Sequence, residues 1–557
     1  MTLDTEKLGL EAQPSRAESD IVGEQIAAPV NTTAGVKRKI KSRHAQMIAL
    51  GGAIGTSFFL AIGQALSVSG PAFLFLAYAV MSVLVYFMVT SIIEMGTFLP
   101  IAGASMNYYA ERYVSKSVGF AMGWLYFYSF GVVVAYELTA ASILISYWPN
   151  DVNIAVWITV FMVIIIGLNL CPVSIYGESE FWFAGIKVIM ILGLLVVSLV
   201  IMLGGGPTHQ RLGFHYWKDP GAVRAYLVEG SAGQFTAFLY VLVFSVFSFN
   251  FGPEQLVFQA GEMQHPRTNL PTAARRFLWR MIVFYAVGTL AVGVICSSTA
   301  KGLLDGAGDA SASPWVIGIQ NAGIKILPSI INAGMLTSAW SAGNAYLFMT
   351  SRTLYSLAKA GSAPKIFTRC NRYGLPHYAV GVSCLFAPLA YMNCAQEAGT
   401  VFNWFISLTN TCGFTSWILS SFVYLRFRKA TDRQGVSVPY RSRLQPYASY
   451  FCLFIFTILL LCNGFTVFFP GQFSASGFIT AYIGIAVILV LYVGHKATAG
   501  RKDPWLLRPD QIDLTTGVAE VEADDLMWNE YMAARGENKP KTLPRKILNK
   551  LGNLLMG

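Results

Sequence analysis

Charge is scarce in this sequence. Asp, Glu, Lys and Arg together make up 12% of the 557 residues, about half the share found in soluble globular domains. Hydrophobic residues account for 54%, and the mean hydropathy is +0.52. The charged residues gather at the two ends of the chain and in short segments between long apolar runs. This distribution excludes a soluble protein and predicts an all-α polytopic membrane protein.

Residue types used for metal binding and covalent chemistry are also few. The chain has eight cysteines and six histidines. The cysteines form no C-x-x-C pair, and most of them lie inside apolar runs, where they are typical small buried residues. Neither a disulfide framework nor a zinc site is expected, and no nucleophile–base pattern indicates an enzyme. We therefore expect no metal ion and no organic cofactor.

The chain also lacks a recognisable cleavable signal peptide and a charge pattern typical of nucleic-acid binding. Residues 1–36 contain no apolar stretch of the kind found in a cleavable signal peptide, so the first membrane segment is expected to act as the targeting signal. The net charge of +11 comes largely from basic residues that flank apolar segments. That placement is typical of membrane proteins rather than of nucleic-acid-binding proteins. The expected macromolecular environment is thus a lipid bilayer, with no nucleic acid.

The apolar runs predict twelve membrane-spanning helices, because about 20 apolar residues cross a bilayer. The predicted spans are 46–69, 71–98, 118–148, 152–172, 179–204, 236–263, 276–300, 324–358, 377–393, 400–427, 446–469 and 473–497. They divide the chain into a largely disordered N-terminal tail, a transmembrane transporter domain and a C-terminal tail. These three parts are expected at residues 1–43, 44–498 and 499–557.

Lysine and arginine indicate the orientation of the spans. If the N-terminus is cytosolic, most basic residues that flank spans lie on the cytosolic side, among them Arg112, Arg275 and Arg428. The outer side then holds only a few, such as Lys301 and Lys325. The sequence therefore predicts that both termini face the cytosol, which requires an even number of spans.

Two glycine-rich breaks interrupt the first and sixth spans. The first, at 51–57, reads Gly-Gly-Ala-Ile-Gly-Thr-Ser, and the second, at 249–254, reads Phe-Asn-Phe-Gly-Pro-Glu. A broken helix leaves backbone groups unpaired in lipid and persists only where protein or a water-filled cavity surrounds it. Paired breaks in two halves are typical of the substrate site of a secondary transporter. Spans 1–5 and 6–10 then form an inverted repeat of two five-helix units, followed by two extra helices.

Each break offers main-chain groups that suit one end of a zwitterion. A half-helix is expected to begin near Thr56, where its N–H groups and the positive end of its dipole suit a carboxylate. Carbonyls freed before Pro253 suit an ammonium group, and the neighbouring phenylalanines are expected to cover the apolar part of the substrate. The predicted substrate-binding residues are Ala53, Ile54, Gly55, Thr56, Ser57, Ser248, Phe249, Asn250, Phe251 and Gly252.

Four of the charged side chains inside predicted spans are candidates for a functional role, because charge is costly in the membrane and usually functional. Lys187 in span 5 either binds and releases a proton or reaches the cytoplasmic interface with its long side chain. Glu137, deep in span 3, is expected to line a polar interior. Glu254 either takes part in coupling or caps the second half-helix of span 6, and Glu94 is either functional or marks a helix end. The predicted proton-coupling residues are Lys187, Glu137 and Glu254.

Several motifs are specific in combination. They are residues 42–52 (Ser-Arg-His-Ala-Gln-Met-Ile-Ala-Leu-Gly-Gly), Glu94-Met95, Gly103-Ala104-Ser105, Glu180-Phe181-Trp182-Phe183, Ile186-Lys187-Val188, Ala260-Gly261-Glu262, His265-Pro266-Arg267, Ser341-Ala342-Gly343-Asn344, Ser351-Arg352, residues 424–430 and Pro439-Tyr440-Arg441. Together they resemble the fungal, yeast-type amino acid permeases of the APC superfamily, from about Lys41 to Gly517. Two positions depart from the family pattern: Ser57 replaces the usual third glycine of the first break, and Pro253 replaces the threonine of the usual Gly-Thr-Glu.

The resemblance implies a LeuT-type fold and proton-coupled uptake of amino acids across the plasma membrane. In this superfamily the break in span 1 binds the substrate carboxylate and the break in span 6 binds the amino group. Lys187 resembles the span-5 lysine that takes the place of a sodium ion in related bacterial carriers.

The sequence thus predicts an amino acid/proton symporter that works by alternating access. Two alternatives remain open. One is an amino acid sensor or transceptor on the same scaffold, signalling through residues 500–557. The other is a carrier for a related amine, such as a polyamine, choline or γ-aminobutyrate. Cytoplasmic regulatory partners are a further expectation for the two tails.

Overall fold

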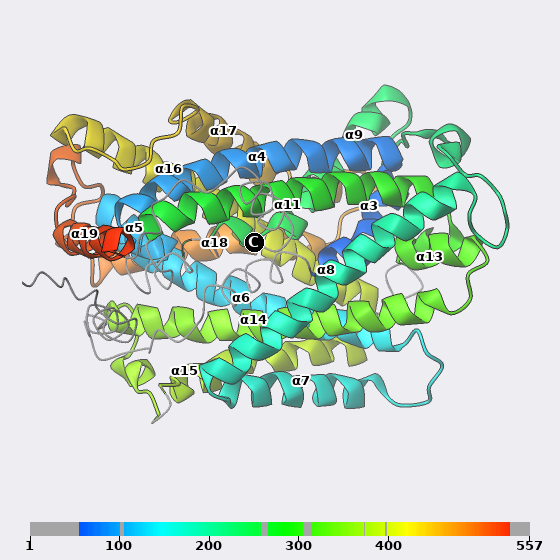
Figure 1. Ribbon diagram of the computed structural model, residues 1–557, viewed down its shortest axis with the longest axis horizontal. Helices are drawn as coiled ribbons and strands as arrows, with labels where there is room; N and C mark the ends of the chain where they lie inside the picture. Colours follow the sequence, from blue (N-terminus) through cyan, green and yellow to red (C-terminus); the bar gives the residue numbers. More distant parts are fainter. Residues whose placement is uncertain are drawn as a thin grey trace, which may run out of the picture.

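The computed structural model describes residues 55–100, 105–254, 257, 266–304, 313–371, 374–395 and 398–534. This part of the chain is helical and contains no β-strand. Most of the long helices run along the longest axis of the molecule, and α8 crosses them obliquely (Figure 1). The predicted N-terminal tail and the predicted binding residues Ala53 and Ile54 lie outside the described residues.

The described residues form the following helices, given in chain order. Those of the first half are α3 (Ile62–Ser69), α4 (Pro71–Phe98), α5 (Met106–Tyr113), α6 (Lys116–Ile145), α7 (Ile154–Leu170) and α8 (Val173–Leu203). Those of the second half are α9 (Gly230–Phe249), α11 (Pro266–Ile295), α12 (Lys301–Leu304), α13 (Pro314–Asn321), α14 (Leu327–Lys359), α15 (His377–Ser383) and α16 (Ala398–Gln434). The last are α17 (Tyr447–Leu461), α18 (Ala475–Ala497) and α19 (Val518–Ala534). Short π-helical segments lie at Ser57–Ala61 and Trp217–Gly221, and 3-10 segments at Lys365–Thr368, Cys384–Cys394, Phe465–Phe468 and Pro509–Gln511.

Within the described residues, five helical segments are long and apolar enough to cross a membrane. They are Pro71–Phe98, Lys116–Ile145, Ile175–Leu203, Gly230–Glu254, which includes the second break, and Ala475–Ala497. Shorter apolar helices lie at Ser57–Ser69, Ile154–Leu170, Met281–Ile295 and Tyr447–Leu461. The protein is therefore polytopic, and the count of twelve spans stays a prediction.

The pattern along α8 shows how the sequence separates a lipid face from an interior face. Trp182 and Ile189, seven residues apart, are 66% and 73% exposed. Ala184 and Lys187, between these two residues in the chain, and Ile191, just after them, are fully buried. A spacing of three to four residues returns to the same side of a helix. In a membrane the exposed apolar side faces acyl chains, and Lys187 therefore points into the protein.

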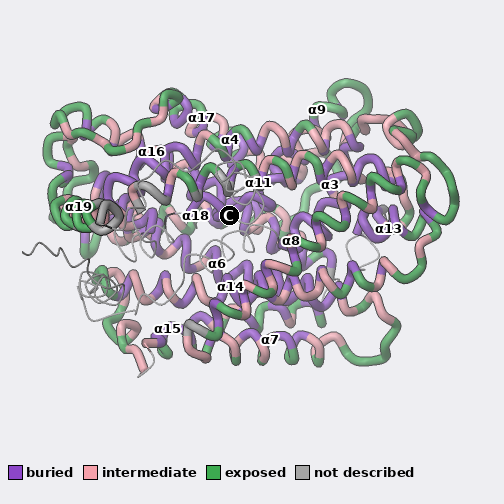
Figure 2. The backbone as a smooth tube through the Cα atoms, in the orientation of Figure 1, coloured by how far each residue is buried: buried purple, intermediate pink, exposed green. Residues whose placement is uncertain are grey.

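Two pairs of helices organise the interior. The most extensive contacts in the molecule join α6 to α14 and α4 to α11, while α9 packs on α4 and α3. Figure 2 shows that buried residues concentrate along these central helices, whereas α7 and α8 on the outside alternate between exposed and buried positions. The described residues of the two predicted breaks, 55–57 and 249–254, are buried within this packing.

The two ends of the molecule differ. α5 and α19 lie at one end, here called the α19 end, and α13 lies at the opposite one (Figure 1). Residues 499–534 pack along the α19 end. The backbone N–H of Leu507 donates to the carbonyl of Val114 at 2.9 Å, and Arg112 donates to the carbonyls of Asp513 and Thr516, both at 2.7 Å.

Candidate substrate and coupling site

The predicted break in the sixth span is present. Helix α9 ends at Phe249, Asn250 leaves the helical region with φ −59° and ψ 135°, and a second helical turn starts at Gly252. Phe251 adopts a positive φ of 57°, a left-handed conformation that costs an L-residue about 1–2 kcal/mol. Pro253 lies in the first turn of the second half, where its missing N–H is tolerated. The four last carbonyls of α9 have no partner within that helix.

Neighbouring helices hold this break in place. The Asn250 side chain donates to the carbonyl of Thr409 on α16 at 2.9 Å. A Cβ atom at Gly413 would lie 2.3 Å from the Asn250 side-chain oxygen, so any larger residue there would displace the Asn250 side chain. The ring of Phe251 is fully buried and meets the ring of Phe130 edge-on, with centroids 4.9 Å apart. These contacts offset the strain of the left-handed Phe251.

Ser248 lies one residue before the end of α9 and already has two tyrosine partners. The Tyr285 hydroxyl donates to the Ser248 carbonyl at 2.5 Å, and the Tyr78 hydroxyl lies 3.0 Å from the Ser248 hydroxyl. This carbonyl, one of the predicted ammonium acceptors, is therefore shared with α11. The carbonyls of Phe249, Asn250 and Phe251 become the more direct acceptors.

The described half of the first break agrees with the prediction of a new helix start. Gly55 is not helical and the helix begins at Thr56, followed by the π-helical segment Ser57–Ala61. The Thr56 hydroxyl donates to Glu137 Oε2 on α6 at 2.8 Å. A Cβ atom at Gly55 would stand 3.4 Å from the other oxygen of Glu137. The first break thus lies directly against the buried carboxylate of span 3.

Glu137 belongs to a buried group of charges that also includes Lys187 and Glu180. All three side chains are at least 96% buried. The charge of Lys187 on α8 interacts with those of Glu180 and Glu137. Lys187 therefore lies in the interior and does not reach the interface, which rejects that alternative. Two carboxylates around one ammonium leave the group with a net charge of −1 when all three are ionised.

Glu180 was not among the predicted coupling residues. Its carboxylate accepts from the Ser341 hydroxyl at 3.0 Å and from the Asn344 amide at 2.7 Å, both on α14. The Asn169 amide on α7 donates in turn to Asn344 Oδ1 at 2.8 Å. Glu180 could have been found from its position seven residues before Lys187, because two helical turns place both side chains on one face of α8.

Glu254, the third predicted coupling residue, hydrogen-bonds to a different helix from that group. Its Oε1 accepts from the Ser416 hydroxyl on α16 at 2.6 Å. Ser416 is also 2.7 Å from the Tyr126 hydroxyl on α6. Tyr346 on α14 interacts with the charges of both Glu137 and Glu254. Tyr346 therefore lies near both carboxylates, and no sequence pattern had identified it.

Aromatic rings surround the two breaks. The rings of Phe249 and Tyr285 have centroids 4.4 Å apart, and the Tyr285 ring lies 5.0 Å from that of Phe58, which directly follows the first break. Tyr78 is 6.0 Å from Phe249. We call Phe58, Tyr78, Phe249 and Tyr285 the aromatic cluster. All described residues of both breaks, from Gly55 to Ser57 and from Ser248 to Glu254, are buried.

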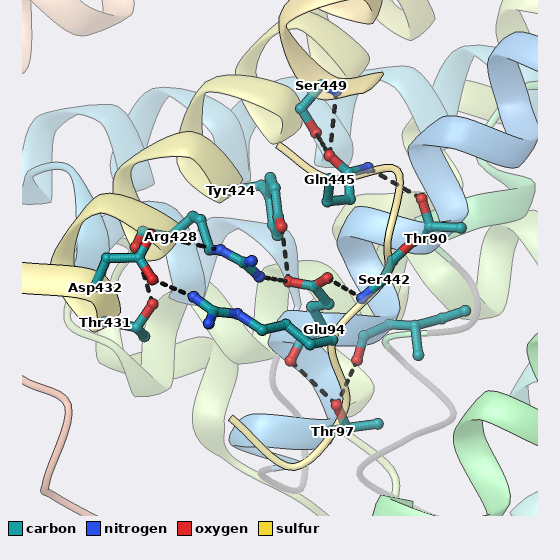
Figure 3. A network of polar contacts seen from close by, with 12 residues as sticks. Thr90, Glu94, Thr97, Tyr424, Arg428, Thr431, Asp432, Ser442, Gln445 and Ser449 are labelled. Atoms are coloured by element: carbon teal, nitrogen blue, oxygen red, sulfur yellow. Dashed lines mark hydrogen bonds and ion pairs between the residues drawn. The ribbon is translucent and has the colours of Figure 1, made fainter. Parts of the chain in front are cut away.

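Glu94, the fourth charged candidate, lies in a separate network at the α19 end. Its Oε2 accepts from Arg428 at 2.9 Å and from the Tyr424 hydroxyl at 2.7 Å, and its Oε1 accepts from the backbone N–H of Ser442 at 2.5 Å. Figure 3 shows these partners converging on the carboxylate between α4 and α16. Glu94 thus lies near the end of its helix, as one of the two sequence interpretations held, and fixes the two helices to each other.

Comparisons with known proteins agree with this architecture. The chain is similar to the solved structure of a manganese transporter from Eremococcus coleocola, with a TM-score of 0.51, 14% identity, and coverage of 84% of this chain and 97% of that one. At that identity the likeness concerns the fold. Among the described residues no group of three or more metal-ligating side chains occurs. The described helices therefore share the overall fold of that transporter.

The sequence relatives are more specific. Residues 44–508 match the family model of amino acid permeases. The chain is 45% identical over 492 residues to a proline-specific permease of Emericella nidulans, covering 87% of this chain and 89% of the relative. It is 47% identical over 506 residues to a probable proline-specific permease of Schizosaccharomyces pombe, with 90% of each covered. The chain belongs to the amino acid permease family and is a transporter, not an enzyme.

Proposed function

We propose that the protein is an amino acid/proton symporter that brings its substrate into the cell across the plasma membrane by alternating access. Both termini, and therefore the α19 end, face the cytosol. The observation that carries the proposal is the 2.8 Å hydrogen bond from Thr56 to Glu137. It joins the expected carboxylate site to a buried charge group that can hold a proton.

The substrate is held as a zwitterion between the two breaks. Its carboxylate meets the start of the helix at Gly55–Ser57, where N–H groups and the helix dipole favour a negative charge. Its ammonium group meets the carbonyls of Phe249, Asn250 and Phe251 at the end of α9. The aromatic cluster covers the apolar part.

We further propose that the preferred substrate is proline. The names of the two relatives motivate this choice, and two features of the site support it. The aromatic cluster offers flat apolar walls to a pyrrolidine ring. Protonated proline has two N–H donors, whereas other protonated α-amino acids have three. The Ser248 carbonyl already accepts from Tyr285. A substrate that needs fewer acceptor carbonyls therefore suits this site.

Coupling follows from the charge of the buried group. Glu137, Lys187 and Glu180 carry a net −1 when ionised, and one proton makes the group neutral. A neutral group is less costly to enclose during the occluded step than a charged one. Because Thr56 links Glu137 to the first break, protonation and substrate binding favour each other.

Radiolabelled proline uptake into liposomes containing the purified full-length protein tests the proposal. An inward proton gradient is expected to drive accumulation, and Lys187→Ala is expected to abolish accumulation while proline counterflow persists. Lys301→Ala, an exposed lysine after α11, is the matched control and should transport normally. Accumulation by Lys187→Ala that still follows the pH gradient would reject the coupling role.

The same liposomes separate the alternatives. A sensor would bind proline, seen as a thermal shift, yet show negligible flux. An amine carrier would be inhibited by amines that lack a carboxylate and not by α-amino acids. Either result would overturn the proposed function.

A further inference from the structure

An apolar groove lies outside the candidate substrate site and shares no residue with it. It encloses about 250 Å³ between α6, α18 and the 3-10 helix Cys384–Cys394. Its walls include Trp124 and Phe127 from α6, Phe386 from the 3-10 helix, and Val487 and Leu491 from α18. The groove adjoins lipid-facing surface, because Leu385 and Val490 beside it are 71% and 69% exposed.

Aromatic contacts make the walls of this groove rigid. The rings of Phe127 and Phe386 meet edge-on with centroids 5.4 Å apart, and Trp124 lies 5.6 Å from Phe127. The Trp124 indole N–H donates to the carbonyl of Ser362 at 3.2 Å, which fixes the ring. A groove with fixed walls does not collapse when empty, so it favours an occupant of matching shape.

The part of the groove nearest the α19 end, which is cytosolic in the proposed orientation, leads to exposed basic side chains. Lys116 is the first residue of α6, and its side chain is 64% exposed. Arg501 and Lys502 follow α18 and are exposed. Between them and the groove, Phe120 stacks on His495 at 4.4 Å and joins the two helices. We call Lys116, Arg501 and Lys502 the basic rim.

Acidic groups only partly offset the charge of this rim. Asp503 lies 3.8 Å from Lys116 and is half-buried, and Glu111 on α5 also interacts with Lys116. Lys496 is buried and donates to the carbonyls of Gly500 and Asp503, which leaves its positive charge in the same place. The surface next to the groove remains positive, as expected of a site for an anionic headgroup.

The spacing along α6 fits one acyl chain. Leu125 in the groove is nine residues after Lys116, which corresponds to about 13.5 Å along a helix. Half of the hydrocarbon core of a bilayer measures about 15 Å. A lipid whose headgroup lies at Lys116 therefore has a chain of the right length to reach the groove.

We propose that this groove and the basic rim form a binding site for an anionic phospholipid of the cytoplasmic leaflet. One acyl chain lies between α6, Phe386 and α18, and the phosphate and carboxylate of the headgroup meet Lys116 and Lys502. The lipid holds α18, which lies outside the repeat, against α6. Neither the family nor the proposed transport function requires this site.

The full-length protein in nanodiscs, containing equal amounts of phosphatidylserine and phosphatidylcholine with the same photoreactive acyl chain, tests the site. Cross-links from phosphatidylserine are expected at residues 124–128 and 484–491, several-fold more abundant than those from phosphatidylcholine. Equal labelling by the two lipids, or labelling spread evenly over lipid-facing helices, would overturn the proposal.

Matched variants sharpen the result. Leu491→Trp fills the groove and should lower the phosphatidylserine cross-link several-fold, whereas Leu489→Trp, on the outward side of the same helix, should not. The pair Lys116→Gln and Lys502→Gln should remove the preference for phosphatidylserine, and Lys325→Gln at the other end should keep it. If Leu491→Trp does not fold, the cross-link map of the unmodified protein decides.

Discussion

At the scale of single residues, Thr56 connects two functions that the sequence placed in different spans. The start of the first half-helix was predicted from glycines, and Glu137 was predicted from the cost of a buried charge. Their contact at 2.8 Å could not be predicted, because the distance between residues 81 positions apart depends on packing and not on local pattern. The contact makes Thr56 a positioning residue for the carboxylate.

The first prediction concerns the Thr56 hydroxyl. Thr56→Val keeps the volume but leaves Glu137 without this donor, and a hydrogen bond to a charged group contributes about 1.5–3 kcal/mol. We expect a rise in the KM for uptake of roughly tenfold or more, together with a changed dependence of KM on external pH. Thr56→Ser, which retains the hydroxyl, should restore both. A pH profile of Thr56→Val identical to that of the unmodified protein would contradict the link.

The second prediction concerns Glu180. Glu180→Gln keeps the hydrogen-bonding shape that Ser341 and Asn344 require but removes one negative charge from around Lys187. We expect proton-driven accumulation to fall at least tenfold while proline counterflow is retained. Glu178→Gln, an exposed carboxylate two residues away on the same helix, serves as the control. Full accumulation in Glu180→Gln would show that this carboxylate is structural only.

At the scale of helices, the position of the second break was predicted from the sequence, but the contacts from other helices that stabilise it were not. The sequence located the interruption at 249–254, and α9 ends at Phe249 with Phe251 left-handed. A proline after a glycine is a local signal, which explains that success. The Thr409 carbonyl that accepts from Asn250 and the closely packed Gly413 both belong to α16, more than 150 residues later in the chain. The sequence near the break therefore gives no indication of them.

The third prediction tests this support. Gly413→Ala would push a methyl group into the Asn250 side chain, 2.3 Å away, and overpacking of this kind costs about 1–3 kcal/mol. We expect a lower thermal midpoint, and proline binding weakened at least fivefold. Gly193→Ala on α8, where nothing lies within 4 Å of the added carbon, should be neutral or slightly stabilising. Unchanged proline affinity in Gly413→Ala would contradict a binding role for the break.

At the scale of the whole molecule, the predicted helical membrane class and the family are confirmed, the count of twelve spans stays a prediction, and the predicted segment 71–98 is α4 to the residue. Hydropathy is a local property, so it reveals apolar segments directly. The packing of residues 499–534 was missed, because their composition is polar and the contacts are mostly main-chain carbonyls. Arg112, only 8% exposed, is the centre of that packing.

The fourth prediction concerns this docked segment. Arg112→Ala removes the donors to the carbonyls of Asp513 and Thr516 and should release residues 499–534, seen as faster proteolysis and a lower thermal midpoint. Arg433→Ala is the control, because Arg433 and Asp510 are both more than 60% exposed at 3.4 Å, and exposed pairs contribute little. Equal protease sensitivity of the two variants would contradict the assignment.

The pH dependence of this docking follows from Asp513. Burial acts to raise the pKa of Asp513, but hydrogen bonds from Thr516 and Thr515 and the charge of Arg112 hold it well below its usual range. A lowered pKa gives stability that is complete above the ordinary value of about 3.9 and is lost only as the pH falls through the lower, folded-state value. Protease sensitivity should therefore stay constant between neutral and mildly acidic pH.

The central claim is that the two breaks hold a zwitterion between them. A cryo-EM structure of the full-length protein with bound proline tests it directly. The account predicts density for the carboxylate at the helix start of Gly55–Ser57 and for the amino group at the carbonyls of Phe249–Phe251, against the aromatic cluster. Proline bound elsewhere, with both breaks making no contact to it, would contradict the account.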